Sequence, residues 1–204
     1  MTTSFKEPPK NLQAMFDFSI AGPLLGMIGS IVAIAVGTQL SAGADPTNFP
    51  ALPLEILRQS SLGGGIVESV LGSGILSIPD GARGTQAVAS MVIPLHPVAV
   101  AGYISLVVNA LSMLPIGTTD GGRVALALFG RQGKQAIGGL AMLAILLFGI
   151  QGSDLFLFYY AFCLAFQKGN EIPCRNEVET PDFSRVITAT VAYFLALLAL
   201  IPFQ

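Results

Sequence analysis

The sequence predicts an all-α polytopic membrane protein, and three observations support that fold class. Of the 204 residues, 52% are hydrophobic and only 11% are charged, whereas a soluble domain usually contains about 25% charged residues. The mean hydropathy is +0.70. Several runs without charge are long enough to cross a hydrocarbon core of about 30 Å. We therefore expect five or six membrane segments, with one re-entrant or interfacial stretch, in a single membrane domain over residues 1–204.

The charge of the chain narrows the class of partner that it is expected to bind. The net charge is −2, and no basic stripe alternates with aromatic residues, so the lipid bilayer and not nucleic acid is the expected partner.

The two cysteines lie in different surroundings, Cys163 in an apolar run and Cys174 in a polar one. A disulfide between them needs a close approach that the sequence does not indicate, so we expect two free thiols.

Residues 18–40 form the first predicted span, which is free of charge and rich in glycine. Gly22 and Gly26 have the spacing that lets a second helix approach closely, although chance explains two glycines equally well in a glycine-rich chain. Pro23 should lie near the start of the helix, where its missing N–H matters little. Residues 41–53 contain three prolines and are expected to form a loop outside the membrane.

Residues 54–84 make a poor spanning helix because glycines interrupt them and because Arg58, Glu68 and Asp80 lie among them. We expect an interfacial or re-entrant segment, or a short helical hairpin. Glu68 has two interpretations, a buried functional carboxylate or a side chain that faces water on an amphipathic turn, and we favour the second.

The longest stretch without formal charge is interrupted by His96 and Pro97. Because the residue before a proline avoids helical geometry, we expect one helix to end around Leu95 or His96 and another to begin near Pro97. The second helix should reach about Leu114, since Pro115 follows it.

Residues 123–135 contain Arg123, Arg131 and Lys134 and no acidic residue. This is the strongest positive-inside signal in the chain, and it predicts a loop on the cytoplasmic or stromal side.

The last third of the sequence alternates apolar and charged stretches. The apolar runs 136–150 and 154–166 should form either two short helices or one interrupted hairpin. Residues 168–185 are charged and predict an extramembrane loop, and residues 186–203 predict a final span.

Asp120 is the first charged residue after the apolar stretch, and a carboxylate there is costly to desolvate unless it is paired, metal-bound or able to reach water. Pro115 breaks the preceding helix, and Gly121 and Gly122 remove side-chain bulk and allow positive φ, so that a ligand or another backbone can come close. Asn109 lies upstream and can both donate and accept hydrogen bonds. On spacing alone, we favour a simple turn at the membrane surface as the explanation of the Asp-Gly-Gly sequence.

The spacing of Asn109, Pro115 and the sequence DGGR from Asp120 resembles the second motif of the site-2 protease family of intramembrane zinc metalloproteases. The likeness extends to FDFSIAGPLLG at residues 16–26 and to PCRNEVE at residues 173–179. These segments are similar to the plastid and cyanobacterial branch, which is named after ethylene-dependent gravitropism-deficient and yellow-green mutants. The resemblance covers nearly the whole chain, as the C-terminal half of such a protein, and implies a chloroplast thylakoid or envelope membrane.

The resemblance implies a zinc site in which Asp120 is the third ligand, after two histidines of an HExxH motif on an earlier helix. The glutamate of that motif would be the general base for a water whose pKa the metal lowers to about 7. The bond cleaved would lie in a locally unwound segment of a membrane-protein substrate. Asn109 would orient the substrate strand or its carbonyl oxygen.

The sequence departs from this family pattern at one decisive point. It contains no HExxH motif, and His96 is its only histidine. A catalytic zinc needs three protein ligands, so Zn²⁺ would require ligands outside this chain, and the chain alone is expected to be inactive. For His96 we expect a neutral, hydrogen-bonded side chain at a helix break, and not a group that supports a metal ligand.

Two explanations fit this departure. The chain is the C-terminal half of an intramembrane zinc protease whose HExxH half is missing, and the absence of a secretory signal before residue 16 agrees with that. Alternatively, it is a non-catalytic scaffold or chaperone-like subunit. We favour the first, because a scaffold without metal has no need for Asn109 and Asp120 in this arrangement. A third class, a small-molecule transporter, is suggested by the helix breaks, but no inverted repeat is visible.

Overall fold

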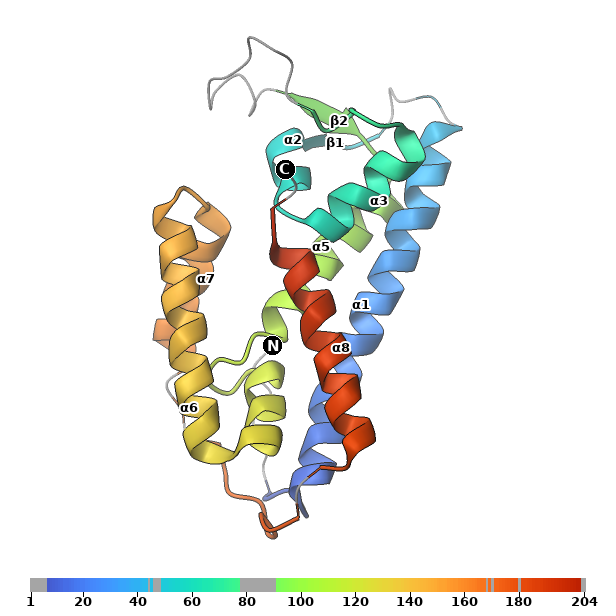
Figure 1. Ribbon diagram of the computed structural model, residues 1–204. Coiled ribbons are helices and arrows are strands. Elements are labelled where there is room, and N and C mark those ends of the chain that lie inside the picture. The colour runs from blue at the N-terminus through green and yellow to red at the C-terminus, as the bar shows by residue number, and fades with distance from the viewer. Residues whose placement is uncertain are drawn as a thin grey trace. The chain divides into compact units, whose positions relative to one another are not determined.

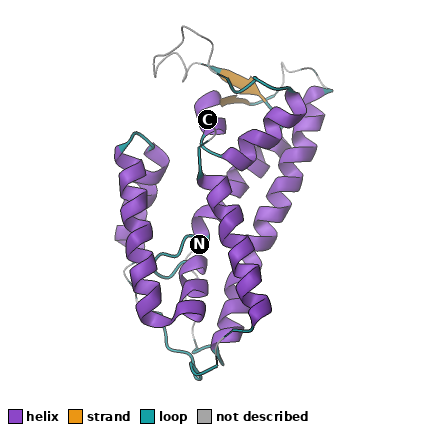
Figure 2. Ribbon diagram, viewed as in Figure 1, coloured by secondary structure: helices purple, strands orange, loops and turns teal. Residues whose placement is uncertain are grey.

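The computed structural model describes residues 7–43, 45, 49–77, 91–167, 169, 171–179 and 181–202. These residues form mainly helices, with one two-stranded sheet (Figure 2). The helices are α1 (Leu12–Ala42), α2 (Leu54–Arg58), α3 (Ser61–Leu71), α5 (Pro97–Ser112), α6 (Asp120–Ile150), α7 (Asp154–Phe166) and α8 (Phe183–Leu200). The strands are β1 (Ala51–Pro53) and β2 (Val92–Pro94).

The contacts within the chain divide it into two units, and each is described by itself. The first unit comprises Met1–Leu24 and Ser112–Phe194, and the second comprises Leu25–Leu111 and Leu195–Gln204. Helices α1 and α8 therefore each contribute residues to both units. The expectation of one membrane domain over the whole chain stays a prediction.

Three of the helices, α1, α6 and α8, are long and apolar enough to cross a membrane. Helices α3, α5 and α7 are shorter and also apolar. Large apolar side chains lie exposed on several of them, such as Leu140 at 69%, Phe158 at 74% and Phe194 at 61%. Exposed apolar surface of this extent is typical of helices that face lipid. The mainly helical membrane fold is confirmed, whereas the count of five or six segments stays a prediction.

Helix α1 begins at Leu12 and not at Phe18. The Asn11 side chain accepts a hydrogen bond from the Ala14 amide at 2.9 Å, so an asparagine cap starts the helix early. Pro23 consequently lies inside the helix, which corrects the expectation that it lies near the start.

In the second unit, helices α1 and α5 pack through glycines. A Cβ atom on Gly26 would lie 2.3 Å from Asn109 Oδ1, and one on Gly37 would lie 2.2 Å from the Ala99 nitrogen. No larger residue fits at these positions without displacing the neighbouring helix. Gly22, the other half of the predicted glycine pair, has nothing within 4 Å of such an atom. The predicted close approach is therefore found at Gly26 alone.

The segment before Pro97 is extended and not helical, which corrects the expected helix end at Leu95 or His96. Strand β2 pairs antiparallel with β1, with Ile93 opposite Leu52. Both Ile93 and His96 precede a proline, and that position favours extended backbone. Helix α5 begins at Pro97 as predicted, and ends at Ser112.

Short helices α2 and α3 form the first part of the stretch for which no spanning helix was expected. Glu68, near the end of α3, accepts a hydrogen bond from the Gly74 amide at 2.6 Å, and this bond is exposed. Its carboxylate therefore stabilises the turn after the helix. Residues 78–90, which include Asp80, lie outside the described residues.

The basic segment that was predicted to be a loop is part of helix α6, which is sharply bent at Gly130 (Figure 1). Gly130 has φ 69° and ψ −175°, a conformation that glycine adopts readily and that ends one helical run and starts another. The side of the membrane on which this bend lies stays a prediction.

Helices α6 and α7 form a hairpin, joined by residues 151–153, so the two apolar runs are the interrupted hairpin that the sequence left open (Figure 1). Gly152 in the connection has φ 109°. Between α7 and α8, none of the described residues of the charged segment is helical, which agrees with the loop that the sequence predicted there.

Candidate functional site

Asp120 is the first residue of helix α6, and Thr119 caps that helix. The Thr119 hydroxyl accepts a hydrogen bond from the Gly122 amide at 3.0 Å. It also lies 2.7 Å from the Leu114 and Ile116 carbonyl oxygens, to which it donates. Thr119 is buried. Residues 113–119, here called the motif turn, are thus tied to the start of the helix that carries Asp120.

Gly121 and Gly122 provide the close approach that the sequence predicted, but the approaching group is the motif turn itself. A Cβ atom on Gly121 would lie 1.8 Å from the Met113 carbonyl oxygen, and one on Gly122 would lie 2.6 Å from the Gly117 oxygen. Both glycines are helical, and the positive φ expected for them occurs instead at Gly117, with φ 54°.

The motif turn is also held from its other side by the hairpin. The Gln167 side-chain oxygen accepts hydrogen bonds from the Thr118 amide at 3.1 Å and from the Thr118 hydroxyl at 2.8 Å. A Cβ atom on Gly138, in the second part of α6, would lie 2.8 Å from the Pro115 carbonyl oxygen. Pro115 thus lies where the turn packs closely on the α6 helix.

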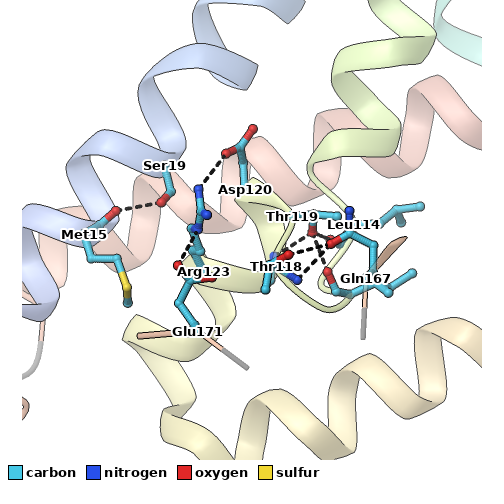
Figure 3. A network of polar contacts seen from close by, with 11 residues as sticks. Met15, Ser19, Leu114, Thr118, Thr119, Asp120, Arg123, Gln167 and Glu171 are labelled. Carbon is cyan, nitrogen blue, oxygen red and sulfur yellow. Dashed lines mark hydrogen bonds and ion pairs between the residues drawn. The ribbon is translucent and has the colours of Figure 1, made fainter. Parts of the chain in front are cut away.

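Arg123 joins Asp120 to the segment that follows α7 (Figure 3). Its Nε lies 3.1 Å from Glu171 Oε1, and its Nη1 lies 3.8 Å from Asp120 Oδ1. The Arg123 and Glu171 side chains are 1% and 4% exposed, whereas Asp120 is 19% exposed. A buried guanidinium is stable only when it is paired, so Glu171 compensates the charge of Arg123. The first turn of a helix also favours a negative charge at Asp120.

Sequence reasoning missed this arrangement. Arg123 was assigned to a basic loop, and Glu171 was not singled out. The sequence signal for this pair was weak. Arg123 is a charged residue directly after the two glycines, and Glu171 is one of several acids in the charged segment near residue 173. A pairing between residues so far apart in sequence follows only from the fold.

The segment PCRNEVE is anchored on two sides. The Arg175 amide donates to the Pro9 carbonyl oxygen at 2.9 Å, next to the start of α1. Glu177 pairs with Arg131 at 2.8 Å and also accepts from the Cys174 amide at 3.0 Å. The hydrogen bond from Arg131 holds the pKa of Glu177 below its usual value.

Both cysteines are free and buried, as predicted. Burial raises the pKa of the Cys174 thiol, which favours the protonated and less reactive form.

Asn109 lies in the second unit, so its position is described separately from that of Asp120. Its amide donates to the Ser105 carbonyl oxygen at 2.8 Å, and its Oδ1 faces the surface of Gly26. Pro115 and Asp120 belong to one turn and helix start in the first unit. The convergence of Asn109 with these residues stays a prediction.

His96 also lies in the second unit and is hydrogen-bonded. Its Nδ1 accepts from the Val98 amide at 3.3 Å, and its backbone amide donates to the Ser41 hydroxyl at 2.8 Å. The ring contacts Phe49 edge-on, with 5.4 Å between ring centroids. This agrees with the expectation of a satisfied histidine at the start of a helix.

The carboxylate of Asp120 fits one position in a zinc coordination shell. It accepts no hydrogen bond from any residue that the structure describes, and Arg123 at 3.8 Å is a distant ion-pair partner. Zinc commonly takes a carboxylate oxygen as one ligand. Within the described part of the chain, however, no three His, Cys, Asp or Glu side chains cluster closely enough to hold a metal ion. The residues described here therefore fit one ligand and not a complete set.

The family follows from a comparison with known proteins. The sequence model of Peptidase family M50 matches residues 2–150, which is more than half of the chain. The chain belongs to peptidase family M50. This family contains the membrane-embedded site-2 proteases, so the resemblance found in the sequence is confirmed.

Relatives cover nearly all of the chain. A probable zinc metalloprotease EGY1, chloroplastic, of Oryza sativa subsp. japonica is 33% identical over 203 residues, which are 98% of this chain and 32% of the relative. The protein of the same name in Arabidopsis thaliana is 30% identical, over 98% of this chain and 34% of its own length. The probable zinc metalloprotease EGY2, chloroplastic, of Arabidopsis thaliana is 24% identical, again over 98% of this chain and 34% of the relative. The chain thus spans about a third of the length of these relatives. No solved structure matches it.

Proposed function

We propose that this chain supplies the aspartate half of an intramembrane zinc protease site. Asp120 would be one zinc ligand, and the HExxH motif would come from sequence outside the 204 residues. One observation carries the proposal. Asp120 lies at a capped helix start whose position the Arg123–Glu171 pair fixes, yet its carboxylate accepts no hydrogen bond from the described residues. A carboxylate that is oriented and open to a ligand fits metal binding better than it fits a surface turn.

The residues of the site would divide the work as follows. Bound zinc supplies Lewis acidity and lowers the pKa of a water to about 7. Asp120 holds one coordination position, and Arg123 restricts the rotation of that carboxylate through its charge. Thr119 keeps the helix start and the motif turn in register, so the carboxylate keeps its direction. Asn109 would orient the substrate strand or its carbonyl oxygen.

The surroundings of the reaction are proposed from the relatives. Their names place them in the chloroplast, so we propose a thylakoid or envelope membrane for this protein. The substrate would be a membrane protein whose helix unwinds locally, and the partner would be the part that carries the HExxH motif. The apolar helices would keep bulk water away from the bond to be cleaved.

The alternative is a non-catalytic scaffold or chaperone-like subunit, and one observation favours it. The chain contains a single histidine, His96, which already accepts a hydrogen bond from its own helix start. The family match gives no support to the transporter.

The first test is the search for the missing ligands. The genomic sequence upstream of Met1 and the chains that co-purify with this protein are read for an HExxH motif on an apolar segment. Finding one supports the protease, and its absence from both overturns the proposal. The assembly is this chain together with the segment that carries that motif.

The second test uses Asp120→Asn in the assembly, with Asp154→Asn as its matched control. Asp154 is also the first residue of an apolar helix, α7, but it is exposed. We expect Asp120→Asn to lose stoichiometric zinc and cleavage of membrane proteins while the helices stay inserted, and we expect Asp154→Asn to keep both. Unchanged zinc content and turnover in Asp120→Asn refutes the assignment of the ligand.

A further inference from the structure

A cavity of about 420 Å³ lies in the first unit, beside the motif turn. Gly117 of the turn, Gly138 and Gly139 of the second part of α6, and the side chains of Gln167 and Glu171 line it. Its volume is in the range of cavities that hold ligands. Of these glycines, Gly139 has nothing within 4 Å of a Cβ position and leaves room for another main chain, whereas Gly117 and Gly138 already pack against Gln167 and Pro115.

Two buried polar atoms in this lining have no hydrogen-bond partner among the described residues. They are Gln167 Nε2 and Glu171 Oε2. Gln167 is 7% exposed, and its side-chain oxygen is fixed by Thr118. Glu171 is held through its other oxygen by Arg123. Buried groups of this kind are rarely left unpaired, so each calls for a partner that the described residues do not supply.

The two open atoms have opposite hydrogen-bonding character, because an amide N–H donates whereas a carboxylate oxygen accepts. A peptide unit provides both complements, since its C=O accepts and its N–H donates. An anionic headgroup would meet Arg131 and Lys134 in the lining, but it offers no N–H to the open oxygen of Glu171. A cation fits poorly because of the same two basic side chains.

We propose that this cavity binds the main chain of an extended polypeptide segment, with Gln167 donating to a carbonyl oxygen and Glu171 accepting from an amide. If the proposed function holds, the segment is the unwound part of the membrane substrate, next to the bond to be cleaved. In lipid an unwound segment has no water to satisfy its backbone groups, so the cavity would stabilise the extended form.

Photo-crosslinking in the assembly tests this proposal, in phosphatidylcholine vesicles and with Asp120→Asn in place to prevent turnover. The photoreactive residue p-benzoylphenylalanine replaces Gln135, which lines the cavity, or Ala136, an exposed neighbour that does not. The probe is a membrane-spanning Leu-Ala peptide with a central Gly-Gly pair, which favours local unwinding, and the same peptide with Ala-Ala is its control. We expect cross-linking from position 135 alone, and with the Gly-Gly peptide alone. Equal yields from both positions, equal yields for both peptides, or products with lipid only overturn the proposal.

Filling the cavity provides a second measurement. Gly139 lines the cavity, and a Cβ atom there meets nothing within 4 Å, so Gly139→Leu adds bulk at the lining where the first side-chain atom causes no clash. We expect Gly139→Leu to lower peptide binding about tenfold, the loss of about one good hydrogen bond, while Ala136→Leu leaves it unchanged. Binding that survives Gly139→Leu overturns the cavity proposal and leaves the protease assignment intact. Cleavage that survives Asp120→Asn overturns the protease assignment and leaves the cross-linking result intact.

Discussion

Asp120 and Asn109 belong to one sequence motif, but the two units give them different surroundings. Asp120 lies at a helix start, is positioned by Thr119 and Arg123, and accepts no hydrogen bond from described residues. Asn109 lies within α5, donates to Ser105 and packs on a glycine of α1. The carboxylate of Asp120 lies 3.8 Å from Arg123, whereas the amide of Asn109 donates to its own helix and packs against Gly26 of α1.

From this difference in surroundings we infer different kinds of role for the two residues of the motif. A side chain that binds a ligand requires neighbours that fix its direction without using its ligand atoms. A side chain that holds a helix pair uses those atoms itself. Two questions follow: whether Asn109 stabilises the fold, and how strongly the buried Arg123–Glu171 pair stabilises the surroundings of Asp120.

The largest effect is expected at Arg123, which is the buried partner of Glu171. Arg123→Ala leaves the Glu171 carboxylate buried and uncompensated, so the free energy of unfolding should fall by about 3–5 kcal/mol. Its control is Arg131→Ala, which removes the exposed pair with Glu177 and should lower it by less than about 1 kcal/mol. Denaturant titration in detergent micelles, followed by circular dichroism, measures both. Equal losses would show that burial does not set the strength of these pairs.

The next effect concerns the helix contact at Asn109. In Gly26→Ala the new methyl group would overlap the Asn109 side chain, so we expect a loss of about 1–3 kcal/mol in the free energy of unfolding. Gly22→Ala, one turn earlier in the same helix, meets nothing within 4 Å and should instead stabilise the helix by about 0.5–1 kcal/mol. A double-mutant cycle of Gly26→Ala with Asn109→Ala should show strong coupling. Additive effects would place Asn109 outside the contact.

A third comparison exchanges the chemistry of the two motif residues. Asn109→Asp removes the donor to Ser105, so it should lower the free energy of unfolding by about 1 kcal/mol and leave the zinc content of the assembly unchanged. Asp120→Asn should change zinc content with little effect on stability. Metal analysis and unfolding of the two variants, measured side by side, decide between these outcomes. Loss of zinc in Asn109→Asp would show that the asparagine acts at the metal site.

The sequence predicted those parts of the fold that depend on local patterns. Charge-free runs located α8, most of α1 and the second part of α6, and Pro97 located the start of α5, because both signals act within one turn or one span. The bend at Gly130 was missed, because a cluster of basic residues suggested a loop. Nothing in the local sequence distinguishes a bent helix from a loop. Strand β2 was missed because its partner, β1, lies some forty residues earlier in the chain.

In the candidate site, too, the sequence indicated only those features that depend on local patterns. Asp120 and its glycines were singled out by their resemblance to a family motif, and their role stays a prediction. The pairing of Arg123 with Glu171 joins segments on either side of the second part of α6 and α7. Gln167 was likewise overlooked, since a single glutamine at the end of an apolar run carries no signal of its contact with the motif turn. The role of such residues depends on tertiary contacts and not on the local sequence.

The smallest effect is expected at Glu177, in the segment anchored by Arg131. Its pKa is below the usual value, so the folded state holds the ionised carboxylate more favourably than the unfolded state does. The resulting stability is fully present above the unfolded pKa of about 4.3 and is lost as the pH falls through the folded pKa. Because the pair is exposed, the contribution should be only a few tenths of a kcal/mol. Unfolding titrations of the parent and of Glu177→Gln should therefore differ slightly at pH 7 and converge once the pH has fallen below the lowered pKa of Glu177. A difference that persists at low pH would mean that Glu177 acts through its hydrogen bond to Cys174 and not through its charge.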